Sequence, residues 1–255
     1  MAVYDIIIPT HDGEEHTLRC LEAIKENTVN YKIIWVDNGS TRSSRHKVIE
    51  KLRDMPYTCS WLETNEGFVK AVNHGITLGN SPLVIILHND AVVTRGWLER
   101  LEYPLKRELL AVGSGSMSSD PEHWQGWPKV KSELFPDMPD FDVKDPSIAS
   151  MLAEDRFKYQ YKQVSSLSFF CVMLKRMIFA KHGFLDEEFE KGMLADEAFC
   201  SKIMANGGKL VFCMSSFVFH QEGTTYKRLY NHGDLRKAEE RNKLLFERKY
   251  SNADK

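Results

Sequence analysis

Residues 83–93 read LVIILHNDAVV, a run of five apolar residues followed by a polar turn that contains Asp90. A continuous apolar run of this length, closed by a turn, is typical of a buried strand in a parallel sheet. In open α/β sheets, ligands bind beyond the carboxyl ends of the strands. A carboxylate at that edge is suited to hold a divalent cation beside a phosphate-bearing ligand.

Apolar strands alternate with amphipathic helices on the N-terminal side of this run. We expect these strands at 4–9, 32–36, 58–62 and 83–87, and helices at 14–27, 43–53 and 67–78. Such alternation predicts right-handed crossovers between parallel strands. The fold class is therefore α/β, with a mostly parallel central sheet flanked by helices.

The second half of the chain is less regular. Prolines interrupt residues 116–150 repeatedly, and Trp124 and Trp127 lie among them. A long irregular stretch inside a compact domain is usually functional or disordered, and the two tryptophans favour a functional loop. Beyond it, we expect strands at 165–174, 210–214 and 217–220, helices at 175–181 and 197–205, and a helical tail after residue 229.

The composition limits the class of protein. A chain of 255 residues that is 42% hydrophobic supports a large core, and its formal charge of −2 does not call for a polyanionic partner. No apolar run approaches the roughly 20 residues that a membrane span needs. The five cysteines are odd in number and scattered. These features predict a cytoplasmic protein with reduced thiols.

Polar residues follow three of the predicted strands. Thr10, His11 and Asp12 follow the first strand, Asp37 follows the second, and Asp90 follows the fourth. Because the carboxyl ends of parallel strands meet at one edge of a sheet, a nucleotide could lie across all three. A single Asp at such a position is more commonly a turn former or a helix cap. The three together favour a binding site.

Residues 65–75, NEGFVKAVNHG, together with residues 87–97 resemble the family 2 glycosyltransferases of the GT-A fold, particularly the rhamnosyltransferase-like branch. The resemblance runs from Val3 to about Trp97, with weaker signals at 184–202 and at His220. It implies an inverting enzyme that moves a hexose or deoxyhexose from a nucleotide-diphosphate sugar to an acceptor hydroxyl. Within one GT-A domain at 1–255, it implies a donor half at 1–115, an acceptor and catalytic half at 116–225, and a charged helical tail at 226–255.

The resemblance also implies how the donor is bound. His11 would stack near the base, Asp37 would bond to the base, and Asp90 would hold Mn²⁺ or Mg²⁺. The implied donor-binding residues are Pro9, Thr10, His11, Asp12, Asp37, Asn38, Asn65, Gly67, Phe68, Asn73, His88, Asn89 and Asp90.

Two histidines join Asp90 as predicted metal ligands. The family motif is Asp, any residue, Asp, but His88 stands at its first position here. His88 either bonds to the ribose or diphosphate through water or joins the metal shell, because neutral imidazole is a competent ligand for Mn²⁺. His220 follows a late strand, where related enzymes place a histidine that reaches the metal or the diphosphate. A buried, hydrogen-bonded imidazole is an equally good interpretation of His220.

Transfer to a hydroxyl needs a base, and the resemblance aligns Asp196 with it. Glu197 is the second candidate, since a shift of one residue exchanges the two roles, and Ala195 replaces the first acid of the family pattern. The alternative is that both acids only favour the dipole of the helix that follows. Trp124 and Trp127 are predicted to stack on a sugar ring of the acceptor, although tryptophans more often complete or cover a core.

Two other functions compete with this interpretation. A non-catalytic nucleotide-sugar-binding module of the same fold would explain His88 and Ala195 at the places of acids. A nucleotidyltransferase would need a Gly-rich basic loop after the first strand, which residues 9–15 do not provide. The acceptor stays open among a glycan, a lipid-linked glycan, a protein, a small molecule and a modified nucleic acid. The interleaved charges of the tail are typical of a solvated helix, with peripheral membrane contact as the weaker alternative.

Overall fold

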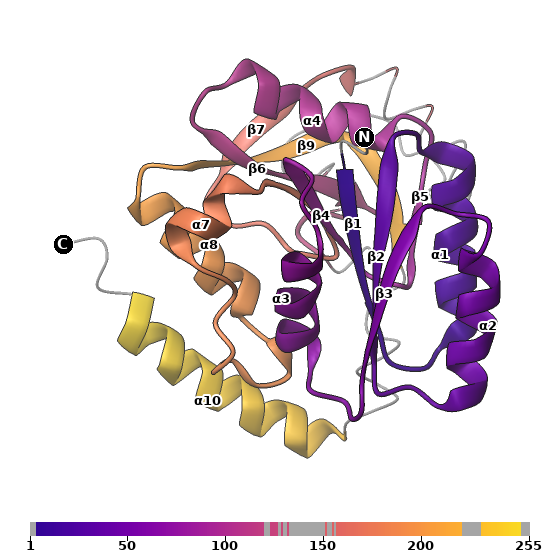
Figure 1. Cartoon of the computed structure of the whole chain (residues 1–255). Helices are drawn as coiled ribbons and strands as arrows, with labels where there is room; N and C mark the ends of the chain where they lie inside the picture. The colour runs from indigo at the N-terminus through magenta and orange to yellow at the C-terminus, as the bar shows by residue number, and fades with distance from the viewer. Residues whose placement is uncertain are drawn as a thin grey trace.

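The computed structural model describes residues 4–119, 123–126, 129, 132, 151, 155, 157–220 and 231–250. Within these residues one sheet of nine strands runs through the molecule in the order β3-β2-β1-β4-β8-β6-β9-β5, with β7 paired to β9. Helices lie on both faces of this sheet (Figure 1). The predicted α/β class, with a central sheet flanked by helices, is confirmed.

The first half is a regular alternation of strands and helices. Its elements are β1 (Tyr4–Thr10), α1 (Glu14–Asn27), β2 (Tyr31–Asn38), α2 (Arg42–Leu52), β3 (Tyr57–Leu62), α3 (Phe68–Leu78) and β4 (Leu83–Leu87). The strands β1, β2, β3 and β4 pair in parallel. Every element predicted for this half is present, with ends within two residues of the expected ones.

The second half mixes strand directions. Its elements are β5 (Ala91–Val93), α4 (Trp97–Arg107), β6 (Ala111–Ser118), β7 (Tyr161–Val164), β8 (Cys171–Lys175), α7 (Met177–His182), η1 (Glu190–Gly192), α8 (Ala195–Ala205), β9 (Lys209–His220) and α10 (His232–Tyr250). β6 and β9 are parallel, whereas β8 is antiparallel to both β4 and β6. β5 and β7 are antiparallel to β9. The two late strands that the sequence predicts form the single strand β9.

The predicted strand at 165–174 is wrong in its first part, because only β8 forms. The residues before β8 bond to side chains rather than to a neighbouring strand. The backbone N–H of Leu167 donates to Sγ of Cys200 at 3.4 Å, and that of Ser168 donates to Oε1 of Gln125 at 2.7 Å. This loop therefore lies against α8, which carries the predicted base.

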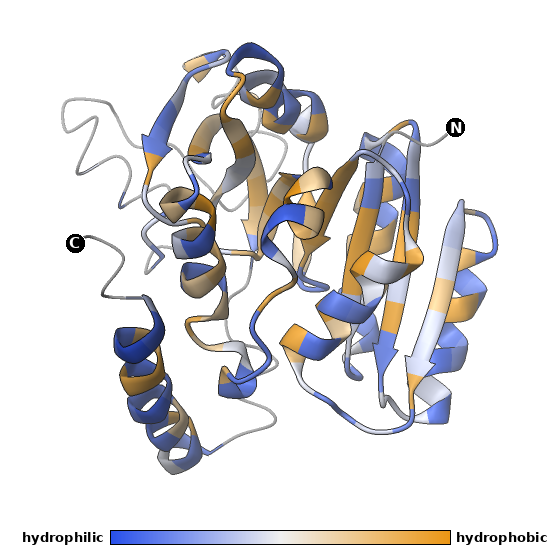
Figure 2. Ribbon diagram, turned by 60° about the vertical axis from the view of Figure 1, so that its left-hand side comes forward, coloured by the Kyte–Doolittle hydropathy of each residue, from blue (hydrophilic) through white to orange (hydrophobic). Residues whose placement is uncertain are grey.

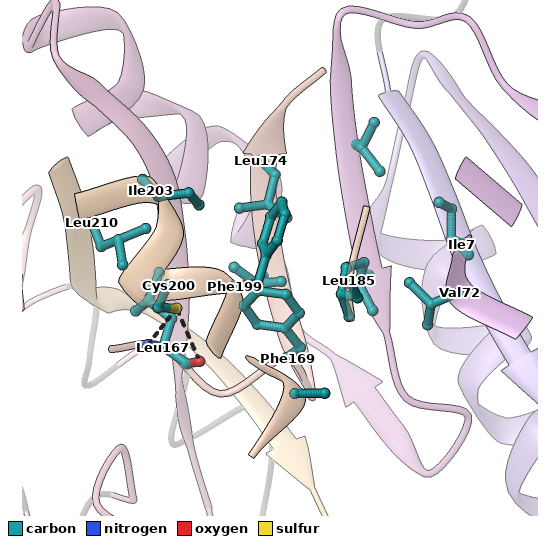
Figure 3. Packing of buried hydrophobic residues seen from close by; sticks show 14 of the residues in the cluster. Ile7, Val72, Leu167, Phe169, Leu174, Leu185, Phe199, Cys200, Ile203 and Leu210 are labelled. Atoms are coloured by element: carbon teal, nitrogen blue, oxygen red, sulfur yellow. Dashed lines mark hydrogen bonds between the residues drawn. The ribbon is translucent and has the colours of Figure 1, made fainter. Parts of the chain in front are cut away.

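Two hydrophobic clusters hold the layers together. Ile6 and Ile8 of β1 pack with Leu21 of α1, whereas Ile7 packs with Val72 of α3 on the opposite face. The cluster that contains Ile7 continues into the second half through α7, α8 and α10. Figure 3 shows the part of it that runs from Ile7 and Val72 to Phe199 of α8. Apolar residues accordingly concentrate in the sheet, while α10 carries many polar residues (Figure 2). No helix in the described ranges is long and apolar enough to cross a membrane.

Candidate active site

Three side chains meet beyond the end of β4. The short strand β5 pairs antiparallel with the end of β9, so that Ala91 lies opposite His220. This register brings Nε2 of His220 to 3.3 Å from Oδ1 of Asp90. Nδ1 of His88 lies 3.9 Å from the same oxygen. The three residues predicted as metal ligands are therefore brought together by the fold.

The ring of His220 is buried in an aromatic environment. It stacks on Phe170 with the ring centroids 4.8 Å apart. Only 6% of His220 is exposed, and neither ring nitrogen makes a hydrogen bond to any described residue. A buried polar atom without a hydrogen bond costs free energy, which a bound cation would offset. The described contacts thus favour the metal-ligand interpretation of His220 over a hydrogen-bonded imidazole.

His88 is neutral near pH 7. Burial lowers the pKa of His88 to about 4, and the neighbouring His220 and His123 lower it too, while Asp90 acts in the opposite direction. Neutral imidazole is the form that binds metals. One ligand atom from each of His88, Asp90 and His220 can be chosen so that all three lie within 4.8 Å of one another. A carboxylate and two imidazoles in this space fit a divalent cation.

Asp196 and Glu197 form a carboxylate pair at the start of α8, and one loop bonds to both Asp196 and His88. Oδ2 of Asp196 accepts a hydrogen bond from the backbone N–H of Phe169 at 3.2 Å. The carbonyl of the next residue, Phe170, accepts one from the backbone N–H of His88 at 2.8 Å. Because Phe169 and Phe170 are consecutive, the predicted base and the predicted metal ligands share one support.

Glu197 influences the pKa of Asp196. Burial raises the pKa of Asp196 well above its ordinary value, and the adjacent Glu197 raises it further. Oε2 of Glu197 is buried and has no hydrogen-bond partner among the residues that the structure describes. A carboxylate with a raised pKa is suited to act as a general base near neutral pH.

Asn38, at the end of β2, organises the loop before α3. Its Nδ2 donates to Oδ1 of Asn65 at 2.9 Å and to the carbonyl of Gly67 at 3.2 Å. Its Oδ1 accepts from the backbone N–H of Glu66 at 2.8 Å. Gly67 has a φ of 89°, a conformation that L side chains rarely adopt. Three predicted donor-binding residues thus form one hydrogen-bonded turn.

The loops after β1 and β2 are also joined. Nδ1 of His11 bonds to the carbonyl of Asn38 at 2.9 Å. The backbone N–H of Asp12 donates to Oγ of Ser40 at 2.8 Å, and its carboxylate accepts from the backbone N–H of Thr41 at 2.8 Å. The predicted residues His11 and Asp12 therefore lie against the end of β2.

Three more predicted donor-binding residues lie in β1 and β2. Asp37 is fully buried and forms an ion pair with Arg45. Oγ1 of Thr10 accepts from Nε1 of Trp35 at 2.9 Å. Pro9 lies beside Thr10 within β1. The side chains of Asp37 and Thr10 therefore already have partners within the protein.

Phe68 and Asn89 lie beside the metal-ligand group. The ring of Phe68 meets that of His88 edge to face at 5.2 Å. Nδ2 of Asn89 donates to Oγ1 of Thr17 on α1 at 3.0 Å. These contacts connect the turn after β4 to α3 on one side and to α1 on the other.

Asn73 lies in a different place. Its Nδ2 donates to the carbonyl of Leu185 at 2.9 Å and to Oε1 of Glu187 at 2.9 Å. Its Oδ1 accepts from the backbone N–H of Leu185 at 3.1 Å. The structure thus brings Asn73 to the segment that follows α7.

The acceptor-side predictions concern two tryptophans. Trp124 is 39% exposed, and its ring centroid lies 5.8 Å from that of Phe212. Trp127 lies outside the described residues. His123 was not predicted as a site residue from the sequence. Its ring lies 5.7 Å from that of Phe170. Neither His123 nor Phe170 belongs to a recognisable motif, so only the fold identifies them.

Residues 5–183 match the family described as glycosyl transferase family 2. The chain belongs to this family. The match covers His88 and Asp90, which are predicted metal ligands, and ends before α8. A comparison with the sequences of curated proteins found no match.

Solved glycosyltransferase structures share the GT-A fold. A crystal structure of GalNAc-T7 with UDP, GalNAc and Mn²⁺ is 17% identical, with a TM-score of 0.65 over 86% of this chain and 44% of that chain. Staphylococcus aureus TarS 1-349 in complex with UDP is 15% identical, with a TM-score of 0.61 over 86% and 60%. The mannosyltransferase PcManGT from Pyrobaculum calidifontis, with GDP-Man and Mn²⁺, is 14% identical, with a TM-score of 0.63 over 89% and 59%. This chain therefore spans 44% to 60% of the length of these proteins.

Proposed function

We propose that this chain transfers a sugar, with inversion, from a nucleotide-diphosphate sugar to an acceptor hydroxyl, assisted by a divalent cation. The observation that carries the proposal is the meeting of His88, Asp90 and His220 at the end of β4 in a family 2 fold. Structures of the same fold contain UDP or GDP-Man, and two of those described above contain Mn²⁺.

Asp90, His88 and His220 would hold the cation. Their mixed oxygen and nitrogen ligands favour Mn²⁺ over Mg²⁺, because Mg²⁺ prefers oxygen ligands. When bound, the cation neutralises charge on the departing nucleoside diphosphate. Phe170 holds His220 by stacking and accepts a hydrogen bond from the backbone of His88, so this side of the site is pre-organised.

Asp196 acts as the base in this proposal. It takes the proton of the acceptor hydroxyl while that oxygen attacks the anomeric carbon and the bond from this carbon to the diphosphate breaks. Its raised pKa supports the assignment, because a base whose pKa lies near the working pH is the most effective. Glu197 keeps the pKa of Asp196 high and is the second candidate for the base.

The two halves of the chain would bind different substrates. Residues 1–115 would bind the nucleotide-sugar, residues 116–225 would bind the acceptor, and Trp124 and Trp127 would stack on its sugar ring. The resemblance to the rhamnosyltransferase-like branch supports a hexose or deoxyhexose as the sugar. The acceptor is proposed only as a hydroxyl compound.

A donor screen tests this function. The purified protein is incubated with UDP-, GDP- and dTDP-sugars and with Mn²⁺ or Mg²⁺, with and without simple glycoside acceptors, while release of nucleoside diphosphate is measured. We expect release from one donor that is lost in Asp90→Ala and retained in Glu99→Ala, which changes an exposed acid on α4.

Two other results would contradict the proposal. Nucleotide-sugar binding by calorimetry without release from any donor would favour the non-catalytic binding module. Neither binding nor release would refute both functions.

A further inference from the structure

Residues 185–193 connect α7 to α8 and lead directly into the carboxylate pair. The backbone takes an unusual course at the end of this connection, since Lys191, Gly192 and Leu194 all have positive φ, at 55°, 77° and 66°. Non-glycine residues keep such a conformation only where the surrounding structure holds them. Leu194 is the residue before α8, two positions from Asp196. The contacts that hold this turn therefore determine where α8 begins.

Asn242 of α10 supplies three of these contacts. Its Nδ2 donates to the carbonyls of Glu190 and Met193, both at 2.9 Å. Its Oδ1 accepts from the backbone N–H of Glu190 at 3.1 Å. The side chain is fully buried, with 0% exposed. Since a primary amide has two donor hydrogens and one acceptor oxygen, every polar atom of Asn242 is used on this turn.

Asn73 of α3 holds the other end of the same connection. It bonds to both backbone groups of Leu185 and to the carboxylate of Glu187. Asn73 is also buried, with 6% exposed. Two buried amides from helices far apart in the sequence thus hold the connection at both ends.

The other polar contacts between α10 and this connection are more exposed. Lys249 pairs with Asp186 at 2.8 Å, and Arg241 pairs with Glu190. The Lys249 pair is partly buried and the Arg241 pair is exposed, and an exposed ion pair stabilises a fold only slightly. Among the described contacts, the amide of Asn242 is the buried one that reaches the backbone next to α8. Figure 1 shows α10 lying alongside α8.

We propose that Asn242 is a positioning residue, which sets the place of Asp196 and Glu197 by holding the 190–193 turn. Asn73 fixes the opposite end of the connection in the same way. This inference rests on the proposed function, because the position of Asp196 matters for catalysis only if it is the base. It also gives α10 a role in the position of α8.

Turnover and binding measured on full-length variants test the inference. In Asn242→Ala and Asn242→Asp, we expect kcat to fall by roughly 10- to 100-fold while the KM for the donor stays within about twofold, since misplacing a reacting group by a small distance slows the chemical step. Asn242→Asp has no amide N–H for the two carbonyls and should not restore kcat. The matched control is Leu245→Ala, a buried apolar residue on the same helix. It should lower the Tm and leave kcat per folded molecule unchanged.

Hydrogen exchange provides a readout that is independent of turnover. Exchange at the amides of residues 190–197 should become faster in Asn242→Ala while the amides of β1 to β4 keep their protection. Unchanged exchange at 190–197, or a fall in kcat that only follows the folded fraction as in Leu245→Ala, would overturn the inference. A wild-type protein that turns over no donor would instead refute the proposed function, and the exchange result alone would then decide whether Asn242 holds the turn.

Discussion

The ends of β2 and β9 use their polar side chains in opposite ways. At the end of β2, Asn38 makes three hydrogen bonds to the loop before α3. At the end of β9, the ring nitrogens of His220 are buried without a hydrogen bond to any described residue. The first arrangement stabilises a scaffold, whereas the second keeps ligand atoms available at a cost in stability. The proposed metal site therefore lies where the end of β9 meets the turn between β4 and β5.

The largest effect is expected at the carboxylate pair. Asp196→Asn should lower kcat by about 10² to 10⁴-fold, because an amide cannot accept the proton, while donor affinity by calorimetry stays the same. Glu197→Gln should have a smaller effect on single-turnover rates. A larger loss in Glu197→Gln than in Asp196→Asn would show that the two roles are exchanged.

The next effect concerns metal affinity. His220→Leu should weaken Mn²⁺ binding by roughly 100-fold in a calorimetric titration, since it removes an imidazole ligand. His46→Ala, which changes an exposed histidine on α2, serves as the control and should leave the affinity unchanged. Equal affinity in His220→Leu and the wild type would remove His220 from the metal site.

The same substitution at both strand ends tests the comparison in terms of stability. Asn38→Leu should lower the free energy of unfolding by about 1 to 2 kcal/mol, because three partly buried hydrogen bonds of its amide are lost. His220→Leu should lower it less in the absence of metal, because its ring nitrogens have no hydrogen bond to a described residue and only the contact of Nε2 with the Asp90 carboxylate is lost. Urea denaturation measures both values. Similar losses for the two variants would refute the contrast.

The smallest effect is a shift in pH dependence. The pKa of Asp196 is raised by burial first and by Glu197 second, so kcat should rise as pH increases through that raised pKa. Because Glu197→Gln removes a like charge, it should move the acidic limb of the kcat profile to lower pH.

Stability should respond to pH in the opposite direction. The folded state keeps the proton on Asp196 in the range between the ordinary and the raised pKa, so stability from this group falls as pH rises through that range. If the acidic limb of the kcat profile does not move in Glu197→Gln, Glu197 does not raise the pKa of Asp196.

The first half could be predicted closely because its signals are local. Each strand from β1 to β4 is a short apolar run, and each helix between them has its own apolar face. Asp90 could be predicted as a site residue because it lies in the turn that follows β4. The resemblance at residues 65–75 likewise pointed to the loop before α3, where Asn38 bonds to Asn65 and Gly67.

The second half could not be predicted equally well, since its structure depends on distant partners. β6 reads AVGSGSMS, and its buried serines hide the apolar pattern of a strand. The irregular loop before β8 is fixed by Gln125 and Cys200, which no local pattern connects to it. The contact between His220 and Asp90 follows from the antiparallel register of β5 and β9. Asn73 illustrates the same limit, because its partner Leu185 is 112 residues away.

The most direct test of the central claim is an anomalous diffraction map from crystals grown with Mn²⁺ and a nucleoside diphosphate. We expect a manganese peak next to the Asp90 carboxylate and the imidazoles of His88 and His220. The diphosphate should bind the manganese on the side away from these three side chains. A peak bound elsewhere in the molecule, or a bound nucleotide with no manganese at these three side chains, would contradict it.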